Sequence, residues 1–219
     1  MAKDRAGAHP EGPRDDEIAA GKIGQGLERL VYFSDAVIAI AMTLLAIELP
    51  IPEGDDGSEL WQSFLEYLRQ DYFTFALSFV VIALFWVGHH RMFMWIDHLG
   101  PGLIPRNFCF LFLIVIMPFA TRMLDDTDGS TLGTVFYASV VTAIGLIRLE
   151  MLRFARRRGL LRPEGEHQRS RVNPVWMTTI AFGLSIPIAF ASPEAAMWSW
   201  LILSVIVGQV LQLLRRRQR

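Results

Sequence analysis

The sequence predicts an all-α, polytopic membrane protein. Of its 219 residues, 52% are hydrophobic and only 20% are charged. The charged residues are almost absent from six long apolar windows and are crowded between them, and about 20 apolar residues suffice to cross a bilayer as a helix. A soluble helical domain would instead carry charges along one face of every helix. The formal net charge of −1 gives no reason to expect a nucleic-acid partner.

Six membrane spans are expected. The first stops before Pro50, which cannot continue a helix, and the fifth starts at Pro174, a residue well suited to a first turn. In chain order the spans are Leu30–Leu49, Tyr72–Met94, Arg106–Met123, Thr131–Leu149, Pro174–Ser192 and Ala195–Leu214. They divide the chain into a disordered segment (1–27), a six-helix membrane domain (28–215) and a basic tail (216–219). The lone Cys109 cannot form an intramolecular disulfide.

Lysine and arginine indicate the orientation of these spans. When both termini and the even-numbered connections are placed on one side, every one of the 21 basic residues except Arg69 and Arg122 falls on that side. Cytoplasmic loops carry an excess of Lys and Arg. Both termini are therefore expected in the cytoplasm.

The opposite side is acidic. Its loops carry Glu53, Asp55, Asp56, Glu59, Glu66, Asp125, Asp126 and Asp128. This acidity fits either solvated loops or a vestibule that attracts cations. Residues 58–70 have apolar side chains at helical spacing, which predicts a short interfacial helix with Trp61 and Tyr67 near the headgroups.

The first span contains a carboxylate inside its apolar stretch. An intramembrane carboxylate such as Asp35 is costly, and such groups usually face the bundle interior and find a partner. Candidate partners at the same depth are Trp86, His89, His90 and Asn107, together with Ser34 beside Asp35. The sequence therefore predicts a polar cluster that pins three helices together, and a direct role in transport is the alternative.

The same span carries an apolar stripe at steps of four and three residues. The stripe consists of Phe33, Val37, Ile40, Leu44 and Ile47. It fits either packing against a neighbouring helix or the lining of a pore made from several copies, where stacked apolar rings gate by excluding water. Thr43 would then offer oxygen to a cation in the pore, or bond back to the preceding turn in the packed alternative.

These residues lead to a family resemblance. Arg29-x-x-x-Phe33-Ser34-Asp35 on the first span resembles the transmembrane protein 175 family, specifically its bacterial branch. The similarity continues in Ser78-Phe79 and Trp86-Val-Gly-His89-His90-Arg-Met-Phe93 of the second span, and in Asn107 and Met117-Pro118-Phe119 of the third. It covers roughly residues 28–215.

The resemblance implies a potassium-preferring cation leak channel in a bacterial plasma membrane. It implies a homotetramer whose first helices line the pore, with Ile40 at the narrowest point, Leu44 and Ile47 in further apolar layers, and Thr43 at a position tied to potassium preference. The implied structural polar network comprises Arg29, Phe33, Ser34, Asp35, Trp86, His89, His90 and Asn107. The implied partners are other copies of the chain, the lipid bilayer, and potassium or other monovalent cations, with no cofactor beyond the permeant ion.

Two other functions deserve comparison. A proton- or ion-coupled secondary transporter could use Asp35 and His89 or His90, and Pro118 and Pro187 could interrupt its helices, but no internal repeat is visible. An enzyme is not expected, because the sequence contains no phosphate-binding loop, nucleophile elbow or His-Glu-x-x-His motif. A metal site on His89, His90, Asp97 and His98 is disfavoured, because adjacent histidines point about 100° apart on a helix.

Overall fold

The computed structural model describes residues 15–69, 71–162 and 174–200, and this part of the chain is almost entirely helical. Its helices are α1 (Asp15–Ile47), α2 (Gly57–Arg69), α3 (Asp71–Met94), α4 (Leu103–Asp126), α5 (Thr131–Arg157) and α7 (Pro174–Ala191). Residues 193–200 are helical as well. The predicted all-α class is confirmed.

Four described helices are long and apolar enough to cross a membrane: α1 from Gln25 onward, α3, α4 and α5. They correspond to the first four expected spans. The fifth corresponds to α7, whose apolar part, Met177–Ala191, is shorter. Most of the sixth expected span and the tail 216–219 lie outside the described residues.

Two helices extend further than expected. α1 begins at Asp15, within the segment 1–27 that was expected to be disordered. Residues 15–29 include three glycines, so their composition does not explain this extension, but adding residues to an existing helix is far easier than starting a new one. α5 runs to Arg157 instead of stopping at Leu149, so its last turns carry several arginines.

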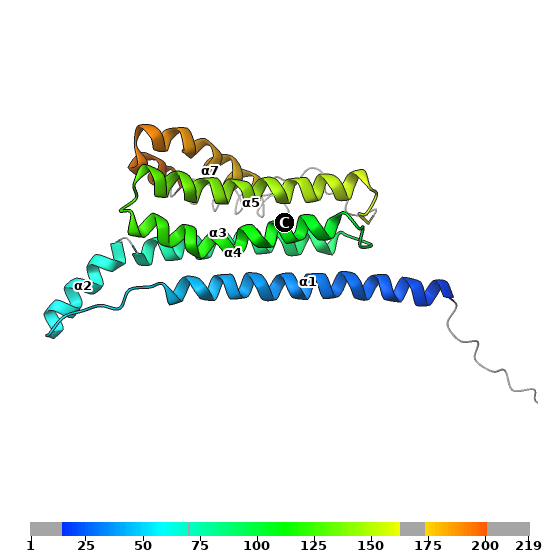
Figure 1. The fold of residues 1–219 in the computed structure, drawn as a ribbon, viewed down its shortest axis with the longest axis horizontal. Coiled ribbons are helices and arrows are strands. Elements are labelled where there is room, and N and C mark those ends of the chain that lie inside the picture. Colours follow the sequence, from blue (N-terminus) through cyan, green and yellow to red (C-terminus); the bar gives the residue numbers. More distant parts are fainter. Residues whose placement is uncertain (1–14, 70, 163–173, 201–219) are drawn as a thin grey trace, which may run out of the picture.

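The helices form successive layers (Figure 1). α1 lies along one edge, α3 and α4 form the middle, and α5 followed by α7 forms the other side. α1 and α4 finish at one end of the bundle, where α3 and α5 begin. We call this the acidic end, because Glu48, Asp71 and Asp126 lie there, and the opposite end the basic end. α2 projects from the acidic end with Leu60, Trp61 and Leu68 exposed.

The core lies between α3, α4 and α5. Its largest fully buried side chains include Phe85, Phe110, Ile114 and Tyr137, each at most 1% exposed. α4 and α7 continue as helices through their internal prolines, Pro118 and Pro187, so neither residue interrupts its span.

A backbone clasp closes the basic end. The Asp97 amide donates to the Leu160 carbonyl, and the Arg162 amide donates to the Trp95 carbonyl, both at 2.9 Å. This clasp ties the α3–α4 connection to the segment that follows α5.

Candidate functional site

One face of α1 anchors the helix to the bundle. Ser34, Ile38, Ala41 and Leu45 recur at steps of four, three and four residues, and each is at most 2% exposed. Within the described residues, α1 packs against α3 and α4 but not against α5 or α7. The described helices therefore hold α1 from one side only.

The stripe singled out in the sequence lies on another face. Ile47 is 74% exposed, Ile40 is 58% exposed and Leu44 is 40% exposed. Val37 is partly buried, and the Phe33 ring lies against Phe108 with 5.6 Å between ring centroids. Within the described chain, Ile40, Leu44 and Ile47 are thus not the packing face of α1. A pore-lining role for them stays a prediction.

Thr43 is exposed beside this stripe. Its hydroxyl donates a 2.8 Å hydrogen bond to the Ile40 carbonyl, which is the back-bond to the preceding turn. That bond uses the hydroxyl hydrogen and leaves the lone pairs of the oxygen free to accept. The back-bond is therefore compatible with an oxygen that faces a cation.

A buried hydrogen-bonded chain joins α3, α4 and α1. Asn107 Nδ2 donates to Ser34 Oγ at 2.9 Å, and Ser34 Oγ donates to the Leu30 carbonyl at 2.7 Å. Asn107 Oδ1 lies 2.8 Å from His89 Nε2. Since this oxygen can only accept, His89 must carry its hydrogen on Nε2. Asn107 therefore bridges two helices through one amide, and all three polar side chains are fully buried.

A second, separate contact involves Asp35. Trp86 Nε1 donates to Asp35 Oδ1 at 2.9 Å, and the Trp86 ring stacks on His90 with 5.5 Å between centroids. The expected single cluster is thus two contacts side by side, with His89 in one and His90 in the other. Arg29 is exposed and forms no ion pair with another described residue.

Sequence reasoning missed a second buried polar group. Ser78 Oγ lies 3.0 Å from the Tyr137 hydroxyl and 2.9 Å from Thr121 Oγ1, so one hydroxyl from each of α3, α4 and α5 meets in the core. Single hydroxyls in apolar spans carry no distinctive spacing. Only the presence of Ser78 in the family resemblance pointed toward this group.

Arg148 is another buried polar residue whose contact sequence reasoning missed. It lies inside α5, next to the expected end of the fourth span, and is only 6% exposed. Its Nη2 donates to the Gly88 carbonyl of α3 at 2.6 Å, while Nε has no hydrogen-bond partner. Arg148 therefore holds α5 to α3 one residue before His89.

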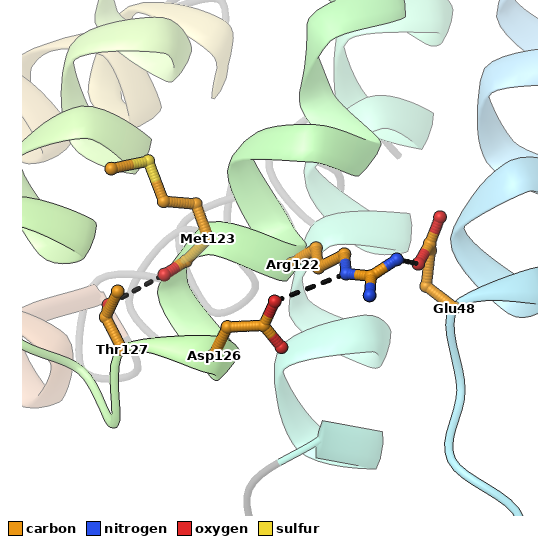
Figure 2. A network of polar contacts seen from close by, with 5 residues as sticks. All are labelled: Glu48, Arg122, Met123, Asp126 and Thr127. Carbon is orange, nitrogen blue, oxygen red and sulfur yellow. Dashed lines mark hydrogen bonds and ion pairs between the residues drawn. The ribbon is translucent and has the colours of Figure 1, made fainter.

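At the acidic end, Arg122 joins α4 to the end of α1 (Figure 2). Arg122 Nη1 donates to Glu48 Oε2 at 2.6 Å, and Nε lies 3.3 Å from Asp126 Oδ2. Glu48 therefore contacts a neighbouring helix, through an arginine that the sequence identified only as an exception to the basic-side pattern.

A metal centre finds no support in the described part of the chain, which contains no group of three or more His, Cys, Asp or Glu side chains placed to hold a metal ion. His98 and Asp97 pair with each other at 3.9 Å. His89 bonds to Asn107, while His90 stacks on Trp86.

The chain is similar to known ion channels. The family model described as endosomal/lysosomal potassium channel TMEM175 matches residues 29–118, which include α1 from Arg29 onward, α2, α3 and most of α4. A potassium channel of Streptomyces collinus is 26% identical over 187 residues, covering 82% of this chain and 90% of the relative. A potassium channel of Chamaesiphon minutus is 32% identical over 124 residues, covering 54% of this chain and 61% of the relative.

The fold agrees with these similarities. The crystal structure of a lysosomal potassium-selective channel TMEM175 homolog from Chamaesiphon minutus superposes with a TM-score of 0.69 at 22% identity. The superposition covers 84% of this chain and 97% of that structure. The matched residues contain both polar contacts that hold α1, and the helical arrangement extends beyond them. These similarities support membership of the TMEM175 family.

Proposed function

We propose that this chain is a potassium-preferring cation leak channel of a bacterial cell membrane. In this proposal it acts as a homotetramer, and the α1 helices of four copies surround a central pore. The potassium-channel relatives that align over most of the chain support the permeant ion. The proposed mechanism is passive conduction down an electrochemical gradient, with no covalent step and no cofactor.

The observation that carries the proposal is the division of α1 into two faces. One face is buried against α3 and α4, while Ile40, Leu44 and Ile47 are exposed. Four copies arranged about an axis would bring these branched side chains together as stacked rings. A narrow apolar ring expels water and so blocks ions until it widens. We assign the narrowest point to Ile40, with Leu44 and Ile47 as further layers.

Selectivity and positioning are assigned to separate residues. Thr43, exposed one turn along the same side of α1, would offer its hydroxyl oxygen to a partly dehydrated cation. The hydrogen bonds that join Asn107 to Ser34 and His89 fix the rotation of α1. A second contact joins Asp35 to Trp86, whose ring stacks on His90. Arg29 and Phe33 complete the proposed network at the basic end of the pore helix.

The proposed topology places both termini in the cytoplasm and the acidic end outside. The enrichment of Lys and Arg at the basic end of the bundle supports this orientation. The channel domain would comprise residues 28–215, followed by the basic tail 216–219.

Potassium flux from liposomes containing the purified chain tests the proposal. Wild-type protein is expected to release potassium down its gradient without a coupled ion, and Ile40→Asn is expected to increase the flux by wetting the constriction. Leu146→Asn is the matched control, because Leu146 is an exposed apolar residue of α5, which does not contact α1 among the described residues. The absence of potassium flux from both the wild type and Ile40→Asn would contradict the channel. Saturable flux with fixed stoichiometry would favour the transporter that uses Asp35 and His89 or His90.

A further inference from the structure

The acidic end of the bundle contains a charged cavity beside the end of α1. The cavity has a volume of about 330 Å³ and is formed by the end segments of α1, α3 and α4. Four carboxylates line it: Glu48, Asp71, Asp125 and Asp126. Arg122 is the single basic side chain in this lining. The cavity is therefore strongly acidic, and one guanidinium offsets part of its charge.

This cavity adjoins the exposed stripe of α1. Ile47 lines it and is also the last residue of the helix, next to Glu48. If Ile47 faces the ion path, ions that enter from the acidic end pass close to the ion pair between Glu48 and Arg122 before they reach the apolar constriction.

The ion pair between Arg122 and Glu48 is too exposed to contribute much to the stability of the fold. The Arg122 side chain is 58% exposed and the Glu48 side chain is 40% exposed. Ion pairs at such positions contribute little to stability, because water screens them. Their charges nevertheless act on mobile ions over about 30 Å at 0.01 M salt and about 3 Å at 1 M. Charge clustered at a channel mouth changes the local concentration of the permeant ion.

We propose that Arg122 is a conductance-determining residue, which limits cation entry by neutralising Glu48 and Asp126 at the acidic mouth of the pore. This inference rests on the proposed function, since it requires α1 to line the conduction path. Each copy of the chain contributes one Arg122, so a tetramer carries four such positive charges around the mouth.

Opposite single substitutions separate this electrostatic role from a structural one. Arg122→Gln and Glu48→Gln break the same ion pair but change the charge of the mouth in opposite directions. For potassium that enters from the acidic end, we expect Arg122→Gln to raise the single-channel conductance about twofold at 0.01 M salt and Glu48→Gln to lower it by a similar factor. Both effects should nearly vanish at 1 M, and the double variant should return close to wild type.

A matched control is Arg153→Gln, which removes the same charge from an exposed position near the basic end of α5. It should leave entry from the acidic end unchanged. If both single variants shift the conductance in the same direction, or if their effects persist at 1 M salt, the contact matters rather than the charge and the inference fails. If the wild-type protein carries no potassium current, the proposed function itself fails.

Discussion

Asn107 on α4 donates a 2.9 Å hydrogen bond to the hydroxyl of Ser34 on α1, and both side chains are fully buried. The amide uses its oxygen for His89 on α3 at the same time. One amide therefore links α1 to two neighbouring helices and contributes to its rotation. This rotation buries the Ser34 face and leaves the Ile40 face exposed.

Removing this amide should destabilise the bundle. Asn107→Ala leaves Ser34 Oγ without its donor and His89 Nε2–H without its acceptor, and each unsatisfied buried group costs about 1–3 kcal/mol. We expect a total loss of about 2–4 kcal/mol in the free energy of unfolding, measured by thermal or denaturant unfolding in detergent micelles. Cys109→Ala, two residues further along α4 at an exposed position, should change little.

A double-mutant cycle then isolates the pair. Ser34→Ala and Asn107→Ala together should show a coupling energy of about 0.5–1.5 kcal/mol, within the range for hydrogen bonds between membrane helices. Strict additivity of the two substitutions would show that the hydrogen bond does not hold α1.

Replacing Arg148 should not weaken the fold. Arg148 is buried, has no carboxylate partner among the described residues, and leaves Nε unsatisfied. A buried charge carries a desolvation cost, and apolar replacements of similar size are often neutral or stabilising. We expect Arg148→Met to unfold at the same denaturant concentration as wild type or a higher one. A loss above about 3 kcal/mol would mean that Arg148 has a charged partner in the assembled protein.

Potassium preference should depend on the hydroxyl of Thr43. Thr43→Val keeps the branched shape but removes the oxygen, while Thr43→Ser keeps the oxygen and removes a methyl group. We expect Thr43→Val to lower the potassium-to-sodium permeability ratio several-fold and Thr43→Ser to retain most of it, measured from reversal potentials under bi-ionic conditions. Equal potassium-to-sodium permeability ratios in the two variants would show that the Thr43 hydroxyl does not contribute to selectivity.

The start of α2 should respond to acid. Asp56 Oδ1 accepts from the Ser58 hydroxyl at 2.7 Å and from the Ser58 and Glu59 amides at 2.8 and 2.9 Å. These bonds, led by the Ser58 hydroxyl, lower the pKa of Asp56 below its usual 3.8. Because the folded pKa is depressed, the stabilisation is complete above the unfolded pKa and is lost as pH falls through the folded value.

Amide hydrogen exchange at Ser58 and Glu59 measures this effect. Exchange, corrected for its intrinsic pH dependence, should accelerate below pH 4 in wild type. Asp56→Asn keeps a good capping residue without the titrating group, so its corrected rates should be flat over the same range. Equal acid sensitivity in the two proteins would assign the change to another group.

The sequence by itself determined the class and much of the layout of this protein. Backbone groups cannot remain unpaired in hydrocarbon, so long apolar stretches must become helices. This reasoning placed α3, α4 and α7 within three residues of their observed bounds. The motif around Phe33, Ser34 and Asp35 also led to the family. Helix ends were less predictable, since α1 begins before its apolar window and α5 continues past its own.

Only the tertiary structure decided which residues meet. His89 and His90 are adjacent and chemically alike, yet His89 bonds to Asn107 while His90 stacks on Trp86. Both the buried and the exposed stripes of α1 are largely apolar, so hydropathy cannot tell them apart. The choice depends on the rotation of each helix about its axis, and that rotation is set by hydrogen bonds between residues far apart in the chain, as Ser34 and Asn107 illustrate.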